Sequence, residues 1–200
     1  MIGEPKLNAS FANTQFQIPG YRLFRKDRST SKSGGGVVIY VKSEVQVQRY
    51  ANIESTNVES IMLKLSIGSS NIALLGVYRP PSLAKSIWTK ELSQILENAT
   101  TIAKDTVLLG DLNCDLLNPD KGDKDGRTLM DICDLFDLHC QNATRITNSS
   151  STRIDVVLTN NPHRFRHTSV IESHLNDHKL LFSAMRYHPP RSQPKFITYR

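Results

Sequence analysis

Hydrophobic and polar positions divide the chain into short apolar runs and two amphipathic stretches. The run VVIYV at 37–41 is β-branched and continuously apolar, which is typical of a buried strand. From Val58 apolar and polar positions alternate, and from Asn71 the run NIALLGVY is more continuously apolar. The GSS between these runs predicts a β-hairpin whose second strand lies deeper in the sheet.

Two helices are predicted in the middle of the chain. The prolines of RPPSL end the preceding strand, because proline has no backbone donor and a fixed φ. The apolar positions that then fall on one helical face are Ile87, Trp88, Leu92, Ile95, Leu96, Ala99 and Ile102. A second helix is predicted from Thr128, with Leu129, Ile132, Cys133, Leu135 and Phe136 on its apolar side and Asp131, Asp134 and Asp137 outward. Between the helices, TVLLG predicts a short buried strand.

The last third of the chain predicts strands in RIDVVLTN, HTSVIES and KLLFSAMRY. Near the start, the basic, Gly/Ser-rich segment RLFRKDRSTSKSGGG at 22–36 predicts a loop. Hairpins combined with two helices favour two sheets with helices outside them. We predict one domain over residues 1–188, followed by a linker at 189–200, where the composition changes to PPRSQPKFITYR.

Composition indicates a globular protein, with 38% hydrophobic and 22% charged residues in a chain of 200. Its formal charge of +6 fits a polyanionic partner without requiring one. The three cysteines, an odd number without a C-x-x-C pair, argue against a disulfide framework. No apolar run approaches the roughly 20 residues that cross a bilayer, and no signal segment opens the chain. We therefore expect an intracellular protein, nuclear or cytoplasmic, without a membrane partner.

A zinc site is not expected. Cys133, His139 and Cys140 are close in sequence, but no spacing of four ligands accompanies them.

Several polar residues stand at the ends of predicted strands. Asp111 and Asn113 follow TVLLG, Asp177 and His178 precede KLLFSAMRY, and Tyr78 closes IALLGVY. Each has a simpler explanation when taken alone: the first four favour turns or caps, and a tyrosine ring packs readily on a sheet.

Asp155 is harder to explain as a structural residue. It lies in RIDVV, two residues after an arginine and within a β-branched run, so it must be paired or face a cavity. Together with the other strand-end groups it suits phosphodiester hydrolysis, which needs an aimed water, charge stabilisation and a cation or acid at the leaving oxygen. Mg²⁺ binds a few carboxylates from separate strands, and Asp155 could orient His178 through a hydrogen bond.

The motifs GVYRPP, LLGDLN, RID and NDH occur in the order and approximate spacing of the endonuclease/exonuclease/phosphatase superfamily. The chain resembles most closely the apurinic-type endonuclease domain of non-LTR (LINE-type) retrotransposons. Further likenesses, IPGYRLFRKDRS with GGGVVIYV and ATRITNSSSTRIDVVLTN, extend the resemblance over roughly residues 1–188. The resemblance implies an α/β (α+β) fold, a four-layer sandwich of two packed mixed β-sheets flanked by helices.

The same resemblance implies a divalent-metal-dependent phosphodiester hydrolase that nicks target DNA. Its expected cofactor is Mg²⁺ or Mn²⁺, with no small-molecule cofactor, and its expected partner is DNA. We also expect a monomer.

Roles for five residues follow from matching positions. Asp111 resembles the aspartate that orients or deprotonates the attacking water, and Asn113 its phosphate-contacting companion. Asp155 resembles the aspartate that orients His178, which itself resembles the histidine that binds the scissile phosphate. Tyr78 resembles the tyrosine that contacts the phosphate or the leaving group.

Metal and DNA contacts are implied in the same way. Asp177 resembles an acid near the metal, and Glu4, in GEPKL, stands where the family has a metal-binding glutamate in a stretch like SETKL. Arg79, Thr144 and Arg145 are expected DNA contacts on rim loops, although ordinary loop capping also explains them. The family's first strand, first helix and an asparagine have no counterpart before Glu4, so we expect an N-terminally truncated domain whose activity is impaired.

Two alternatives remain open at this stage. One is a non-catalytic remnant that only binds nucleic acid through the basic residues Arg22, Arg25, Lys26, Arg28 and Lys32 and the HRFRH segment at 163–167. A solvated loop is the preferred explanation of the first of these runs, at 22–32. The other is a phosphomonoesterase or lipid-headgroup phosphatase on the same scaffold, because one fold hosts many substrates.

Overall fold

A computed structural model describes residues 1–28, 35–122, 124–141, 145–146, 151–171 and 180–187. The chain order of its elements is β1, β2, β3, β4, β5, β6, α1, β7, α2 and β8 to β13, with three short 3₁₀ helices. The predicted linker at 189–200 lies outside the described residues. No helix among the described residues is long and apolar enough to span a membrane.

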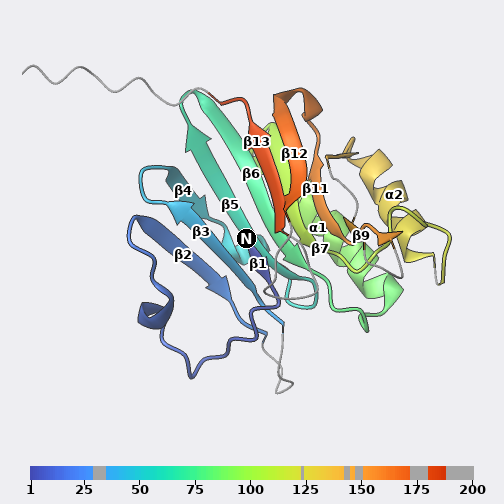
Figure 1. Ribbon diagram of the computed structural model, residues 1–200, viewed down its shortest axis with the longest axis horizontal. Coiled ribbons are helices and arrows are strands. Elements are labelled where there is room, and N and C mark those ends of the chain that lie inside the picture. The colour runs from blue at the N-terminus through green and yellow to red at the C-terminus, as the bar shows by residue number, and fades with distance from the viewer. Residues whose placement is uncertain (29–34, 123, 142–144, 147–150, 172–179, 188–200) are drawn as a thin grey trace, which may run out of the picture.

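A mixed six-stranded sheet forms the centre of the molecule (Figure 1). In spatial order its strands are β4 (Gln46–Arg49), β5 (Glu59–Ile67), β6 (Ser70–Tyr78), β7 (Asp105–Asp111), β11 (Asp155–Thr159) and β8 (His139–Cys140). β6 and β7 are parallel, and the other neighbours are antiparallel. The predicted hairpin is confirmed as β5 and β6, and TVLLG forms most of β7.

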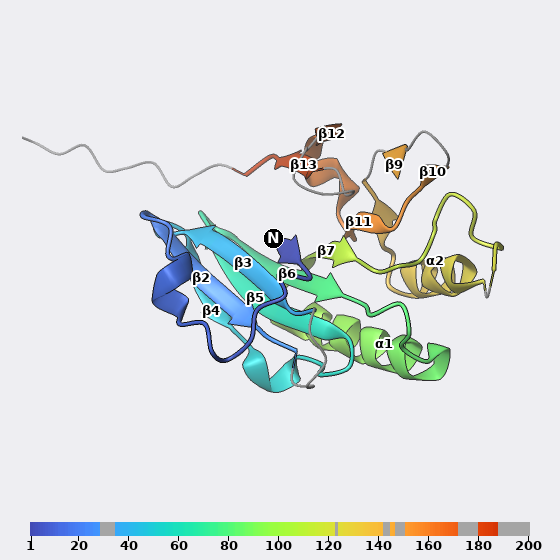
Figure 2. The same ribbon diagram turned by 60° about the horizontal axis from the view of Figure 1, so that its bottom comes forward.

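Helices α1 (Lys85–Ile102) and α2 (Asp125–Leu135) cover one face of this sheet (Figure 2). The buried face of α1 consists of Trp88, Leu92, Ile95, Leu96 and Ala99, as its helical period predicts. Ile87 is an exception and is 42% exposed. In α2, Cys133 is buried in the core as predicted, whereas Leu135 is 73% exposed, because it falls outside the helical face that Leu129 and Ile132 share with Cys133.

A second layer covers the opposite face of the six-stranded sheet (Figure 2). It consists of a three-stranded sheet, β1 (Ile2–Gly3), β3 (Val37–Lys42) and β2 (Tyr21–Lys26), and of a hairpin, β12 (Phe165–Ile171) and β13 (Leu180–Met185). The short elements outside the two layers are β9 (Arg145–Ile146), β10 (Ser151–Thr152), and 3₁₀ turns at Asn13–Phe16, Ala51–Ile53 and Pro162–Arg164.

The predicted α/β class with packed sheets flanked by helices is confirmed. Both α-helices lie on the same side, so the described residues form three layers: helices, the six-stranded sheet and the second sheet layer. A fourth layer of helices outside the second sheet layer is not present among the residues that the structure describes.

The prediction of a loop over 22–36 is wrong for its first part, because Tyr21–Lys26 is a six-residue strand. β2 pairs with β3 along its whole length, and Phe24 packs against the core between the layers. Two of its cations are neutralised: Arg25 pairs with Asp27 two residues on, and Lys26 lies 3.5 Å from the Glu54 carboxylate. Arg22 donates to the Val45 carbonyl. Because these side chains all have partners within the molecule, a basic segment can form a strand here.

Gly110 fixes the close pairing of β7 and β6, where it lies opposite Val77. A Cβ atom at Gly110 would stand 1.7 Å from the Val77 carbonyl oxygen, inside the main chain of the neighbouring strand. Any side chain at this position must therefore push the two central strands apart.

We predict that Gly110→Ala lowers the free energy of unfolding by about 1–3 kcal/mol or more, because overpacking a core usually costs this amount. Urea denaturation measures the change. Gly3→Ala is the control, because a Cβ there meets the Tyr78 ring at an ordinary 3.6 Å, and its effect should stay within about 0.5 kcal/mol. Equal stability of the Gly110→Ala protein and the wild type would contradict this account of the strand pairing.

Candidate active site

Three strand ends bring Tyr78, Asp111 and Asp155 into one row across the central sheet. Tyr78 ends β6 and pairs in register with Asp111 at the end of β7, and Asp111 pairs with Asp155 at the start of β11. Residues directly opposite one another on neighbouring strands point to the same face of a sheet. Tyr78 packs in the core between the two sheet layers, so all three side chains lie on the face that β1 and β3 cover.

Glu4 approaches this row from the second layer. It follows β1 directly, and its backbone N–H donates to the Gly36 carbonyl at 3.0 Å. Burial raises the pKa of Tyr78 to about 12, and the nearby Glu4 and Asp111 carboxylates add to the effect, while Arg28 opposes it. Glu4, Tyr78 and Asp111, far apart in the sequence, therefore share one electrostatic environment.

Asn113 is fixed in a tight turn directly after β7. Its backbone N–H donates to Asp111 Oδ1 at 2.9 Å, and its side-chain Nδ2 donates to the Arg79 carbonyl at 2.8 Å. Its φ of 49° lies in the left-handed region, which asparagine tolerates better than most residues. The turn-forming explanation of Asp111 and Asn113 is thus correct in itself, and the same turn holds both side chains beside the row.

Asp115, the second acid of the GDLNCD run, belongs to the loop rather than to the row. Its carboxylate accepts the backbone N–H groups of Leu117 and Arg153, each at 3.0 Å. Burial opposes ionisation of Asp115, but hydrogen bonds from Arg153, Asn118 and Leu117 hold its pKa below the usual range. This residue joins the loop after β7 to the segment that leads into β11.

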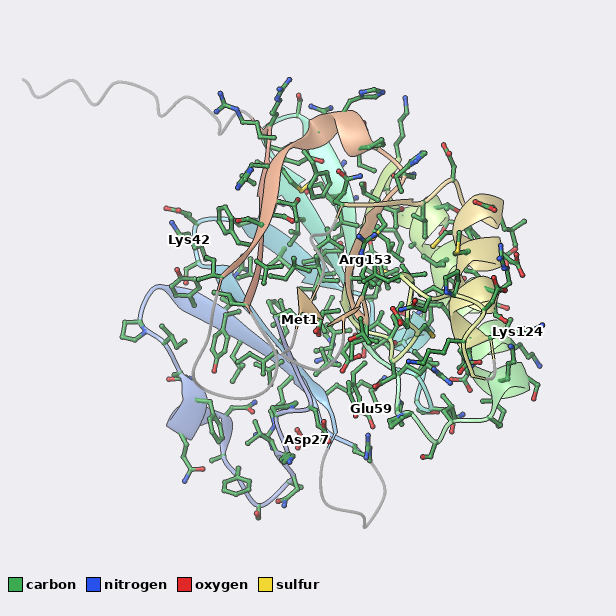
Figure 3. All side chains as sticks on the ribbon, turned by 45° about the vertical axis from the view of Figure 1, so that its right-hand side comes forward. Met1, Asp27, Lys42, Glu59, Lys124 and Arg153 are labelled. Carbon is green, nitrogen blue, oxygen red and sulfur yellow. The ribbon has the colours of Figure 1, made fainter. Side chains whose placement is uncertain are left out.

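Arg28 and Glu59 adjoin the site, although neither residue was predicted to belong to it. Glu59 is 3% exposed and pairs with Tyr78 in the register of β5 and β6. It forms an ion pair with Arg28, whose guanidinium carbon lies 5.8 Å from the centre of the Tyr78 ring. In Figure 3, Glu59 lies below Met1, which is near the middle of the view. Glu59 stands at a polar position of the alternating run that begins at Val58, so the sequence pattern did not mark it as buried.

The expectation that Arg79 contacts DNA from an exposed rim loop is wrong. Its side chain is 3% exposed and forms an ion pair with the buried Asp125. Its guanidinium also donates to the carbonyl oxygens of Leu112 and Asn113, at 3.3 and 3.1 Å. Its Nε has no partner among the described residues but is buried, so the side chain presents no exposed donor to a bound phosphate.

Four other expected site residues cannot be placed in the row. Asp177, His178 and Thr144 lie outside the described residues. Arg145 belongs to β9, which pairs with β10. The predicted roles of these four residues stay predictions.

The donor chemistry of the row fits a hard divalent cation. Glu4, Asp111 and Asp155 are oxygen donors, and Mg²⁺ is usually held by one or two carboxylates together with water and substrate phosphate. The described residues include no group of three or more histidine, cysteine or acidic side chains placed to hold an ion. A cation at this position would therefore be held by few protein ligands, with Glu4 as the first candidate.

Comparison with known proteins gives a family match. The model of the Endonuclease/Exonuclease/phosphatase family matches residues 1–183. No curated protein sequence matches the chain significantly.

Solved structures show a similar fold. The endonuclease domain of TRAS1, a telomere-specific non-LTR retrotransposon, is 16% identical with a TM-score of 0.68, covering 84% of this chain and 81% of that chain. The 3′ phosphatase NExo from Neisseria, bound to a product DNA hairpin, is 18% identical with a TM-score of 0.67, covering 92% and 87%. The catalytic domain of Xenopus laevis APE2 is 13% identical with a TM-score of 0.60, covering 89% and 79%. At these identities the likeness shows the fold alone.

We predict that Tyr78 ionises with a midpoint of about 12, because of burial and the neighbouring carboxylates. The ultraviolet difference titration of wild type against Tyr78→Phe measures this midpoint. Since the folded protein holds the proton more tightly than an ordinary phenol does, its stability should fall as the pH rises from about 10 to about 12.

Glu4→Gln supplies the matched variant. It removes one carboxylate near the phenol and leaves the burial in place, so the Tyr78 midpoint should move down. An unchanged midpoint in Glu4→Gln would show that Glu4 does not share the environment of Tyr78.

Proposed function

This chain belongs to the endonuclease/exonuclease/phosphatase family, and we propose that within this family it is a divalent-cation-dependent DNA endonuclease domain, derived from a retrotransposon, that nicks a phosphodiester bond. The observation that carries the proposal is the register of β6, β7 and β11, which aligns Tyr78, Asp111 and Asp155 at one edge of the sheet. Glu4 joins them from the second layer. Acids from separate strands beside a protonated phenol suit phosphodiester hydrolysis.

Each residue has a distinct part in this proposal. Asp111 orients the attacking water and accepts its proton, a role that needs a carboxylate within hydrogen-bonding reach of the substrate. Tyr78 keeps its proton well above neutral pH, since its pKa is raised to about 12, so its hydroxyl can donate to a phosphate oxygen. Asn113 is held beside Asp111 by the turn and contacts the same phosphate.

Glu4 is the proposed metal ligand among the described residues, and Asp177 is a second one from the sequence. A bound Mg²⁺ or Mn²⁺ would supply positive charge against the phosphate oxygens. Asp155 is proposed to orient His178, a pairing that rests on the sequence motif.

The proposal of DNA as substrate rests on the basic charge, the sequence likeness and the chemistry of similar proteins. The named structural neighbours include a retrotransposon endonuclease domain and a phosphatase bound to DNA. The basic residues of β2 are already engaged inside the molecule, whereas Arg166 and Arg186 are exposed. No carboxylate of the described residues pairs with either arginine. Phosphate contacts are therefore better sought near β12 and β13 than along β2.

We predict that the purified protein converts supercoiled plasmid to the nicked form in the presence of Mg²⁺ or Mn²⁺. Asp111→Asn and Asp155→Asn should each lower the rate at least about 100-fold, as is usual when a proton-transfer or orienting group is lost. Asp120→Asn is the control, because Asp120 is an exposed acid that pairs with Arg127 on the surface. A folded wild-type protein that cuts nothing with either cation would refute the enzymatic proposal.

The same assay separates the nuclease from a phosphomonoesterase on the same scaffold. An oligonucleotide with a 3′-phosphate is offered beside the plasmid, and release of inorganic phosphate is measured. Faster phosphate release than nicking would favour the phosphomonoesterase.

We further predict that Arg166→Ala reduces the slope of log binding constant against log salt concentration by about 1 unit, the loss of one phosphate contact. The measurement is a titration of catalytically inactive Asp111→Asn protein with duplex DNA at several salt concentrations. Arg127→Ala is the control, because its charge is already paired with Asp120. Binding that is salt-dependent and unaffected by Mg²⁺, together with no nicking, would favour the non-catalytic alternative.

A further inference from the structure

We propose that Arg79 is a positioning residue that fixes the turn carrying Asp111 and Asn113. The inference rests on the proposed function in so far as that turn is catalytic. Arg79 follows Tyr78 directly. The end of β6 therefore supplies both a residue of the site, Tyr78, and a residue that bonds to the turn after β7. Its side chain is 3% exposed, and burying a charge is unfavourable unless hydrogen bonds and an opposite charge compensate.

Arg79 bonds to three consecutive residues of the turn. Its backbone N–H donates to the Asp111 carbonyl at 2.9 Å, and its own carbonyl accepts from Asn113 Nδ2 at 2.8 Å. Its guanidinium Nη1 donates to the carbonyls of Leu112 and Asn113 at 3.3 and 3.1 Å. Main chain and side chain of one residue thus hold the turn from two directions.

The other side of the guanidinium is fixed by the helices. Its Nη2 pairs with Asp125, in the first turn of α2, and its plane lies over the Trp88 ring of α1 with the guanidinium carbon 4.7 Å from the ring centre. Asp125 is 5% exposed, and Lys85 Nζ lies 3.5 Å from its other oxygen. The turn is therefore positioned relative to the helical layer and not only by its own chain neighbours.

The packing beneath the turn leaves little room for adjustment. A Cβ at Gly126, next to Asp125, would stand 2.3 Å from the Asp115 carbonyl oxygen. The start of α2 therefore touches the loop that follows Asn113 through main-chain atoms. Asn113 has a left-handed φ of 49°, a conformation that a non-glycine residue keeps only when surrounding contacts hold it in place. The bonds to Arg79 are such contacts.

Arginine is needed here for its geometry as well as its charge. The planar guanidinium presents several donors in fixed directions and stacks on aromatic rings, whereas the lysine ammonium is a single point donor on a flexible stem. Lysine at this position could keep the pair with Asp125 or the bonds to the turn, but not both. Arg79→Lys therefore keeps the positive charge but removes the donor geometry that holds the turn, so it tests the two contributions separately.

The experiment compares Arg79→Lys with Arg49→Lys. Arg49 lies on edge strand β4 and forms two 2.8 Å bonds with the buried Glu54 carboxylate, so it matches the ion-pair chemistry away from the row. Plasmid nicking is measured as kcat and KM at matched folded fractions, and hydrogen exchange by mass spectrometry is measured on a peptide covering residues 111–114.

For Arg79→Lys we expect kcat to fall about 100-fold, the usual effect of misplacing a catalytic group by about 1 Å, with KM changed less than about threefold. We expect amide exchange in 111–114 to accelerate at least tenfold relative to Arg49→Lys. If Arg79→Lys does not fold, Asp125→Asn replaces it. This variant keeps the arginine, loosens its anchor, and should show the same two effects with smaller size.

Unchanged exchange in 111–114 together with unchanged kcat would overturn the positioning role. Equal losses in the Arg79 and Arg49 variants would also overturn it, because they would report stability alone. If the wild type does not cut DNA, the proposed function fails, and the exchange measurement still decides whether Arg79 fixes the turn.

Discussion

The candidate site depends on the register in which β6, β7 and β11 pair. Side chains alternate between the two faces of a sheet, so a slip of one residue in β7 would move Asp111 from the face of Tyr78 to the face covered by the helices. Both faces of these strands are buried, and Leu75, Leu108 and Leu158 are fully enclosed on the helical side. The apolar pattern of the central strands thus determines where the acids of the site stand.

Electrostatics inside the molecule follow from this arrangement. Negative charge gathers at Tyr78 because Glu4 and Asp111 approach it from different layers, and Arg28 is the cation that balances them. Glu59 in turn balances Arg28. A formal charge of +6 says little about where cations are available to a ligand, because several of them neutralise buried carboxylates. The position of each partner matters more than the total.

The sequence predicted the elements whose signal is local. The helical spacing of apolar residues predicted α1, and their alternation predicted the β5–β6 hairpin. The position of acidic residues at the ends of apolar runs predicted that Asp111 and Asp155 stand at strand ends. β2 was predicted as a loop because four cations in a short segment resemble a solvated surface. Two of them, Lys26 in β2 and Arg28 just after it, pair with distant acids, Glu54 and Glu59, the latter 31 positions away. Arg79 was misplaced for the same reason: its partner Asp125 is 46 positions away, and no local pattern reveals the pair. Long-range ion pairs are the part of this fold that periodicity does not encode.

The position of Glu4 depends on such a long-range contact. β1 has only two residues, which is too short to fix a side chain by its own pairing with β3. Gly36 connects Glu4 to the interior, because its carbonyl accepts the Glu4 N–H and its own N–H donates to the buried Glu59 carboxylate. Glycine is required at this point: φ is +91°, and a Cβ would stand 2.8 Å from the Lys26 carbonyl oxygen. One buried acid, Glu59, therefore supports the site twice, through Gly36 beneath Glu4 and through Arg28 beside Tyr78. The position of Glu4, directly after a short outer strand, is in this way determined by contacts with the central sheet.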